Sequence, residues 1–239
     1  MDSAQWLVFA LTIFSAGLIQ GISGFGSALV AMPILVGLVG VRTAAPLVAL
    51  VGLAIELILL IRYRHALQLR EVWRLSVSAA AFIPIGVWAL DLVDERISLR
   101  ILGVVVLGYA LYALLNFRLP RLEHPVWAFF AGALAGVIGG AFNTVGPPVI
   151  LYGDCRRWPR DTFKGNLQGF FAIASLWVAI NHGFNGNLTP SVWRLFLLAL
   201  LALGWGIWIG LKVEHRLPQD AFRKAVLLLL LVLGLRLML

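Results

Sequence analysis

The segment GLIQGISGFGS, residues 17–27, places closely spaced glycines inside a long apolar run. A second glycine-dense segment, GALAGVIGGAFNTVGPPVI, covers residues 132–150. An alignment of the two segments without a gap pairs Gly17 with Gly132, Gly21 with Gly136, Gly24 with Gly139, and Pro33 with Pro148. Glycine-rich interruptions at corresponding places in two halves of an apolar chain are typical of transporters whose site is built from broken helices.

The composition is that of an integral membrane protein. The chain has 239 residues, of which 61% are hydrophobic and 13% charged, and its mean hydropathy is +0.95. A soluble domain of this length cannot bury so much apolar surface. The net charge of +8 does not indicate nucleic-acid binding, because the basic residues cluster between apolar runs as they do in cytoplasmic loops. The single cysteine, Cys155, excludes an internal disulfide, and we expect neither a metal ion nor a cofactor.

Eight apolar regions divide the chain into two repeats of one membrane domain. In the first repeat, residues 1–118, we expect a broken hairpin over 5–39 and helices over 43–61, 72–91 and 97–115. In the second repeat, residues 119–239, we expect a broken hairpin over 125–152 and helices over 166–181, 191–211 and 221–238. Most of the unbroken runs are close to the ~20 residues that cross a ~30 Å hydrocarbon core.

Loop charge favours hairpins over single crossings for the two broken runs. If each run is a hairpin that enters and leaves on the same side, all the strongly basic loops lie in the cytoplasm: 62–74, 118–121, 156–164 and 212–224. We therefore predict an all-α polytopic membrane protein with two inverted-topology repeats and both termini outside the cytoplasm. Hairpin arms of about 15 residues reach ~23 Å, which favours tips near the midplane, although short full crossings stay open.

The interruptions are the candidate substrate site. A helix that starts at each break exposes unpaired N–H groups and the positive end of its dipole, and two facing starts can hold an anion. The candidate substrate-binding residues are Ser23, Gly24, Phe25, Gly26, Ser27, Asn143, Thr144, Val145, Gly146, Pro147, Lys164 and Asn166. The alternative for the glycines is that they only allow close helix packing.

Three further residues are candidates for coupling or gating: Glu56, Arg42 and Gln168. Glu56 lies inside an apolar run, where an acid suggests proton coupling. The alternative, which the sequence favours, is an ion pair with Arg62 or a neighbouring arginine. Arg42 and Lys164 can attract an anion at the two mouths of a pathway or simply extend to the membrane surface from helix ends.

The broken-helix motifs resemble those of the TauE/SafE sulfite exporter family. The resemblance rests on residues 21–35, 132–152 and the Phe-Lys-Gly-Asn segment 163–166. It implies a multi-pass protein of the bacterial inner membrane that carries a small sulfur-containing or organic anion, such as sulfite or sulfoacetate. Phe25 and Ser27 stand where the family often has consecutive glycines, which leaves the size of the ligand open.

The leading hypothesis is a secondary transporter, an exporter that works by alternating access in contact with the lipid bilayer. Export of an anion from a cell that is negative inside is favoured by ~2.3 kcal/mol per charge per 100 mV, so proton coupling is not required. An anion channel is the alternative. An enzyme is disfavoured, because the four histidines lie in separate predicted loops and no nucleophile–base pair is evident: His65, His124, His182 and His215. The sequence leaves self-association open.

Overall fold

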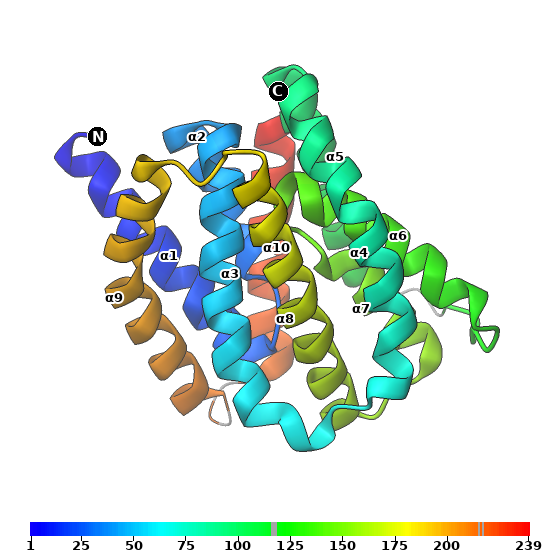
Figure 1. Ribbon diagram of the computed structural model, residues 1–239. Helices are drawn as coiled ribbons and strands as arrows, with labels where there is room; N and C mark the ends of the chain where they lie inside the picture. The colour runs from blue at the N-terminus through cyan, green and yellow to red at the C-terminus, as the bar shows by residue number, and fades with distance from the viewer. Residues whose placement is uncertain (116–118, 215, 217) are drawn as a thin grey trace.

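The computed structural model describes residues 1–115, 119–214, 216 and 218–239, and this part of the chain is helical almost throughout (Figure 1). The predicted repeat boundary at residue 118, the basic-loop residue Arg118 and His215 lie outside the described residues. The elements are α1 Ser3–Ser23, α2 Ser27–Val39, α3 Val41–Tyr63, η1 Arg64–Ala66, α4 Leu69–Leu92, α5 Glu95–Leu115, α6 Val126–Phe142, α7 Gly146–Arg156, α8 Arg160–Phe184, α9 Pro190–Val213 and α10 Gln219–Met238.

Every predicted apolar run is a helix or a pair of helices, so the all-helical class is confirmed. Within the described residues, six helices are long and apolar enough to cross a membrane: α1, α3, α4, α5, α8 and α9. The largest difference in bounds is at α8, which covers Arg160–Phe184 instead of 166–181. Its first and last turns are polar but helical, and an apolar pattern alone does not reveal them. The protein is therefore a multi-pass membrane protein.

Both predicted breaks are present, and each has residues in the left-handed region of backbone space. Gly24 follows α1 with φ 83°, and Gly26 precedes α2 with φ 100°. Asn143 ends α6 with φ 50°, which is rare for a residue with a side chain and most tolerated by asparagine. Glycine and asparagine thus permit the reversal of direction at each break.

The arms of the two hairpins are unequal. The first arms, α1 and α6, have 21 and 17 residues, whereas the second arms, α2 and α7, have 13 and 11. α1 is longer than expected because a capping box starts it early: Asp2 accepts from the Gln5 N–H at 2.7 Å, and the Gln5 side chain accepts from the Asp2 N–H at 3.0 Å.

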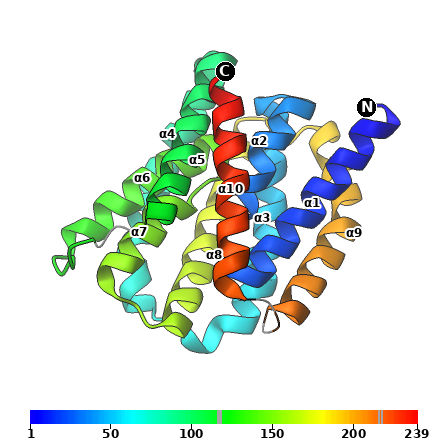
Figure 2. The ribbon, with the colours of Figure 1, turned by 180° about the vertical axis from the view of Figure 1, so that it is seen from behind.

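Helices of the first half pack mainly against helices of the second half, and Figures 1 and 2 show this arrangement from opposite sides. α1 packs mainly on α9, α6 on α4, α5 on α10, and α3 on α8. The seams contain glycine: a Cβ on Gly21 would lie 3.2 Å from the Cα of Gly210, and one on Gly140 would lie 2.2 Å from the Ile83 carbonyl oxygen. The alternative that glycines serve close packing is therefore correct for the glycines of these two seams.

The predicted basic loops gather at one end of the molecule. The Arg156 guanidinium donates to Glu71 at 3.2 Å and to the Leu122 carbonyl at 3.3 Å, which joins three connections. At the other end, where Figure 1 shows both termini, the Val41 N–H donates to Glu95 at 3.1 Å.

Candidate functional site

The first break rests on α8. The side-chain amide of Gln168 donates to the carbonyl of Gly24. A Cβ on Gly24 would lie 3.7 Å from both the Gln168 Nε2 and the Lys164 Cγ. Three predicted residues, distant in sequence, therefore meet at the first break.

The second break rests on α3 and α8. The Asn143 Nδ2 donates to the Val48 carbonyl of α3 at 3.1 Å. A Cβ on Gly52, one turn further along α3, would lie 2.8 Å from the Asn143 Nδ2, 3.7 Å from the Glu56 Oε1 and 3.8 Å from the Ser175 Oγ of α8. Asn143 therefore meets Glu56 and Ser175 around Gly52. Ser175 was not among the predicted residues.

A buried polar stripe on α8 links these two places. Gln168, Ser175 and His182 follow one another at seven-residue intervals, so they lie on one face of the helix, about 10 Å apart along its axis. Each is fully buried, and each has one polar side-chain atom without a partner among the described residues: Gln168 Oε1, Ser175 Oγ and His182 Nε2. The expectation that His182 lies in a loop is wrong, because α8 continues beyond it to Phe184.

The serines of the first break are occupied by the protein itself. The Ser23 hydroxyl lies 2.6 Å from the carbonyl oxygens of both Ile19 and Phe25. The Ser27 hydroxyl and backbone N–H both donate to the Gln20 Oε1, the N–H at 3.3 Å. Gln20, which the sequence did not single out, thus caps α2 from α1, and both serines shape the break.

Phe25 and Gly26 complete the turn between α1 and α2. The Phe25 ring packs edge-on against Tyr109 of α5, with centroids 6.3 Å apart. Gly26 faces Ile19, since a Cβ there would lie 3.5 Å from the Ile19 Cγ2. These two residues place an apolar ring and a partly buried backbone at the break.

The second break offers a ligand fewer donors than expected. The Thr144 hydroxyl donates to the Phe142 carbonyl at 3.0 Å, and Val145 is buried. α7 begins at Gly146, and Pro147 and the proline after it have no N–H. The amide of Asn143 is the main polar side chain left at this break.

The side-chain hydrogen bonds of Asn166 and Arg42 go to residues outside the two breaks. The Asn166 Oδ1 accepts from the Gln68 N–H at 2.8 Å and so holds the connection between α3 and α4. Arg42 donates to the Asp91 carbonyl at 3.0 Å, at the end of the molecule that carries the termini. The structure therefore gives both residues contacts with neighbouring connections.

A charged cluster stands beside the first break. Lys164 forms an ion pair with Glu214, which also accepts from the Tyr63 hydroxyl at 3.2 Å and lies 3.9 Å from the Arg62 guanidinium. Among the described residues, two cations thus lie beside a carboxylate that is 4% exposed. The expected ion pair between Arg62 and Glu56 is not formed, because Arg62 turns toward Glu214.

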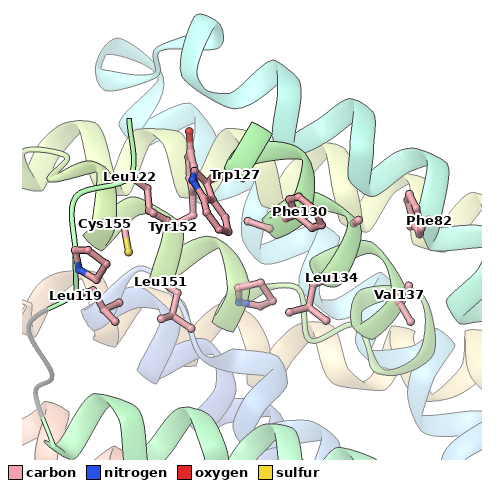
Figure 3. A pocket seen from close by; sticks show the side chains of 14 residues that line it. Phe82, Leu119, Leu122, Trp127, Phe130, Leu134, Val137, Leu151, Tyr152 and Cys155 are labelled. Atoms are coloured by element: carbon pink, nitrogen blue, oxygen red, sulfur yellow. The ribbon is translucent and has the colours of Figure 1, made fainter. Parts of the chain in front are cut away.

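An apolar cavity of about 620 Å³ lies between α4, α6 and α7 (Figure 3). Its lining includes Phe82, Trp127, Phe130, Leu134 and Leu151, and none of the described residues that line it is charged. Such a lining suits hydrocarbon and offers an anion no partner, so this cavity is separate from the candidate site.

Comparison with known proteins identifies the family of this chain. The family model of the sulfite exporter TauE/SafE matches residues 9–237, which include both breaks and all of α8. A relative from Comamonas testosteroni, "Probable inner membrane transporter protein TsaS", is 27% identical over 155 residues, which are 64% of this chain and 65% of the relative. The chain thus spans less than two thirds of that relative's length, and no solved structure gives a significant match. The protein belongs to the TauE/SafE sulfite exporter family of membrane transporters.

Proposed function

We propose that the protein is a secondary transporter that exports a small sulfur-containing or organic anion, such as sulfite or sulfoacetate, across the inner membrane. The family match and the relative named as an inner membrane transporter support the transport of a solute. The anionic substrate is supported by the chemistry of the first break.

The observation that carries the proposal is the meeting of Gly24, Gln168 and Lys164 at the start of α2. The first N–H groups of a helix have no intrahelical acceptor and carry the positive end of the dipole. Of the first N–H groups of α2, only that of Ser27 is bonded by Gln20, whose Oε1 also accepts from the Ser27 hydroxyl. The next two N–H groups have no acceptor among the described residues and can bind a ligand. With Lys164 and Arg62 around the single carboxylate of Glu214, the local charge also favours an anion.

The helix pairing supports two inverted repeats and alternating access. If α1 to α5 correspond to α6 to α10, then the contact of α1 with α9 is the counterpart of that of α6 with α4. Under the same correspondence, α3 with α8 and α5 with α10 are equivalent helices in contact across a two-fold axis. Movement of one group of helices against the other around α3 and α8 would expose the breaks to either side. The basic end is then cytoplasmic and the termini are outside.

The test is counterflow in proteoliposomes preloaded with one anion, with sulfite, sulfate, thiosulfate, sulfoacetate and short carboxylates as external partners. In a carrier, uptake saturates with external anion concentration and is accelerated by anion inside the vesicle. In a channel, uptake neither saturates over the same concentrations nor is accelerated. The same panel is applied to thermal unfolding in detergent, where a ligand at a hundredfold excess over its Kd stabilises by ~2.7 kcal/mol. The proposal is overturned if no anion of the panel is taken up and none stabilises the protein.

A further inference from the structure

Three buried polar side chains from separate segments meet around Gly52. Glu56 of α3 is 5% exposed, Asn143 at the end of α6 is 2% exposed, and Ser175 of α8 is fully buried. Gly52 makes room for them, since a Cβ there would lie 2.8 Å from the Asn143 Nδ2. Polar groups at membrane depth need partners, so the hydrogen bonds of this cluster can be counted.

The count is one donor short. The Val48 carbonyl can only accept, so it fixes the Asn143 Nδ2 toward itself and leaves the Asn143 Oδ1 as an acceptor. The Asn143 Oδ1, the Glu56 Oε2 and the Ser175 Oγ have no partner among the described residues. The second hydrogen of the Asn143 Nδ2 does not serve the Glu56 Oε2, which has no partner, and the Ser175 hydroxyl has one hydrogen, which serves only one of the two other oxygens. A hydrogen on Glu56 would supply the missing donor.

The residues that the structure describes provide no counter-charge for an ionised Glu56. Arg62 on the same helix and Lys164 on α8 both point to Glu214, and Lys212 of α9 lies over the Trp208 ring, 4.8 Å from its centroid. The other ionisable group on the buried face of α8 is His182, about two turns beyond Ser175.

The remaining helices packed on α3 add no cation near this cluster. α1, α2 and α6 carry no ionisable side chain, and α5 reaches α3 through Glu95, an acid, which accepts from the Val41 N–H at the start of α3. Asn143 also stands at the carboxyl end of α6, where the helix dipole is negative. An ionised carboxylate here is unpaired, and its burial is costly.

We propose that Glu56, with Asn143 and Ser175, is a proton-binding site whose occupancy is linked to anion binding at the neighbouring breaks. The proton comes from the aqueous phase, forms an O–H bond with a Glu56 carboxylate oxygen, and donates to Asn143 or Ser175. On release this O–H bond breaks and the proton returns to water. The inference rests on the proposed transport function and adds a second, coupled ion to it.

Charge sets the sign of the linkage. An ionised Glu56 repels an anion held at the breaks, and protonation removes this repulsion, so the proton and the anion favour each other's binding by the same factor. The two therefore cross together, and the direction of net transport depends on both gradients. The cluster around Gly52 is tightly packed, and a proton can bind there because, unlike a larger ion, it needs no cavity.

The experiment measures proton and anion movement together in proteoliposomes, with sulfoacetate as the probe because its groups stay ionised at neutral pH. Wild-type protein should move protons, seen with an internal pH dye, in a fixed ratio to sulfoacetate. Glu56→Gln should lose the coupled proton movement by about tenfold or more, and Ser175→Ala should shift the pH dependence of transport. Ser76→Ala is the matched control, because Ser76 is also buried without a partner but lies on α4.

A second readout needs no transport. Infrared spectra of the wild-type protein should contain a band of a buried protonated carboxylic acid that titrates with pH and is missing in Glu56→Gln. If the wild type transports sulfoacetate and Glu56→Gln moves protons in the same ratio to sulfoacetate as the wild type, the inference is overturned and the proposed function stands. A flux that requires Na⁺ and moves no proton would also overturn it. Absence of wild-type flux with the whole anion panel concerns the proposed function alone, and the infrared band then decides the proton site.

Discussion

The side-chain amide of Gln168, near the start of α8, holds the carbonyl of Gly24, which lies between the two arms of the first hairpin. This bond ties the first break to the helix that also reaches the second break through Ser175. A break held in this way keeps its backbone donors in one geometry, which is a condition for selective binding.

Replacement of Gln168 by Ala should weaken anion binding and lower the temperature of unfolding. The variant leaves the buried Gly24 carbonyl without its donor, at a cost of about 1–3 kcal/mol. Gln68→Ala is the control, because that side chain is exposed and only its backbone N–H is used. Thermal unfolding with and without anion measures both effects, and equal behaviour of the two variants would contradict the role of Gln168.

Lys164→Gln should raise the Kd of the transported anion about tenfold, while Lys164→Arg should retain most of the affinity. Loss of a cation that bonds a charged group costs about 1.5–3 kcal/mol. Lys224→Gln, exposed on α10, changes the net charge equally and should bind as the wild type does. The affinities are measured by titration at constant ionic strength. A comparable loss of affinity in Lys224→Gln would show that Lys164 acts only through the net charge and not through a local contact.

Asn166→Ala should affect stability but not anion affinity. Its Oδ1 accepts from the Gln68 N–H, so the change frees a backbone donor at the connection between α3 and α4 and costs about 1 kcal/mol. Asn143→Ala, at the second break, is the contrasting variant and should change affinity. If Asn166→Ala lowers anion affinity as much as Asn143→Ala does, the prediction is wrong and Asn166 belongs to the binding site.

Gly206→Ala should destabilise the protein, whereas Gly204→Ala should not. Both glycines are on α9, but a Cβ at Gly206 would lie 2.3 Å from the Phe14 carbonyl oxygen, and one at Gly204 meets nothing within 4 Å. Overpacking of this kind costs about 1–3 kcal/mol, and the exposed substitution should stay within about 0.5 kcal/mol of the wild type. Unfolding of the two variants in the same detergent makes the comparison, and equal stability would show that the seam can open without cost.

Much of this fold could be predicted from the sequence, because apolar runs and glycine-rich interruptions are local signals. The positions of Gly24 and Asn143 at the breaks follow from such signals. The meeting of Lys164 and Gln168 with Gly24 does not, since it depends on the packing of α8 against the first hairpin. Helix packing also decides the neighbours of Glu56, Asn143 and Ser175, which come from other helices. The expected pair of Glu56 with Arg62 was wrong, because Arg62 pairs with Glu214.

The polar stripe on α8 had a signal that could have been used. Gln168, Ser175 and His182 recur at seven-residue intervals in an otherwise apolar helix, which places them on one face. Gln20 had no comparable signal, because its bond to Ser27 depends on how α1 and α2 fold back at the break. Contacts across a chain reversal are set by geometry that residue order does not display.

The close contact of Gly21 with Gly210 has a mechanical consequence. Where backbone touches backbone, no side chain is available to change rotamer and let one helix slide along the other. Under the proposed alternating access, α1 and α9 would therefore move as one unit, and so would α4 and α6, which are in contact at Gly140 and Ile83. Each unit would take one helix from either half of the sequence, so the hinge between moving parts would not coincide with the midpoint of the chain.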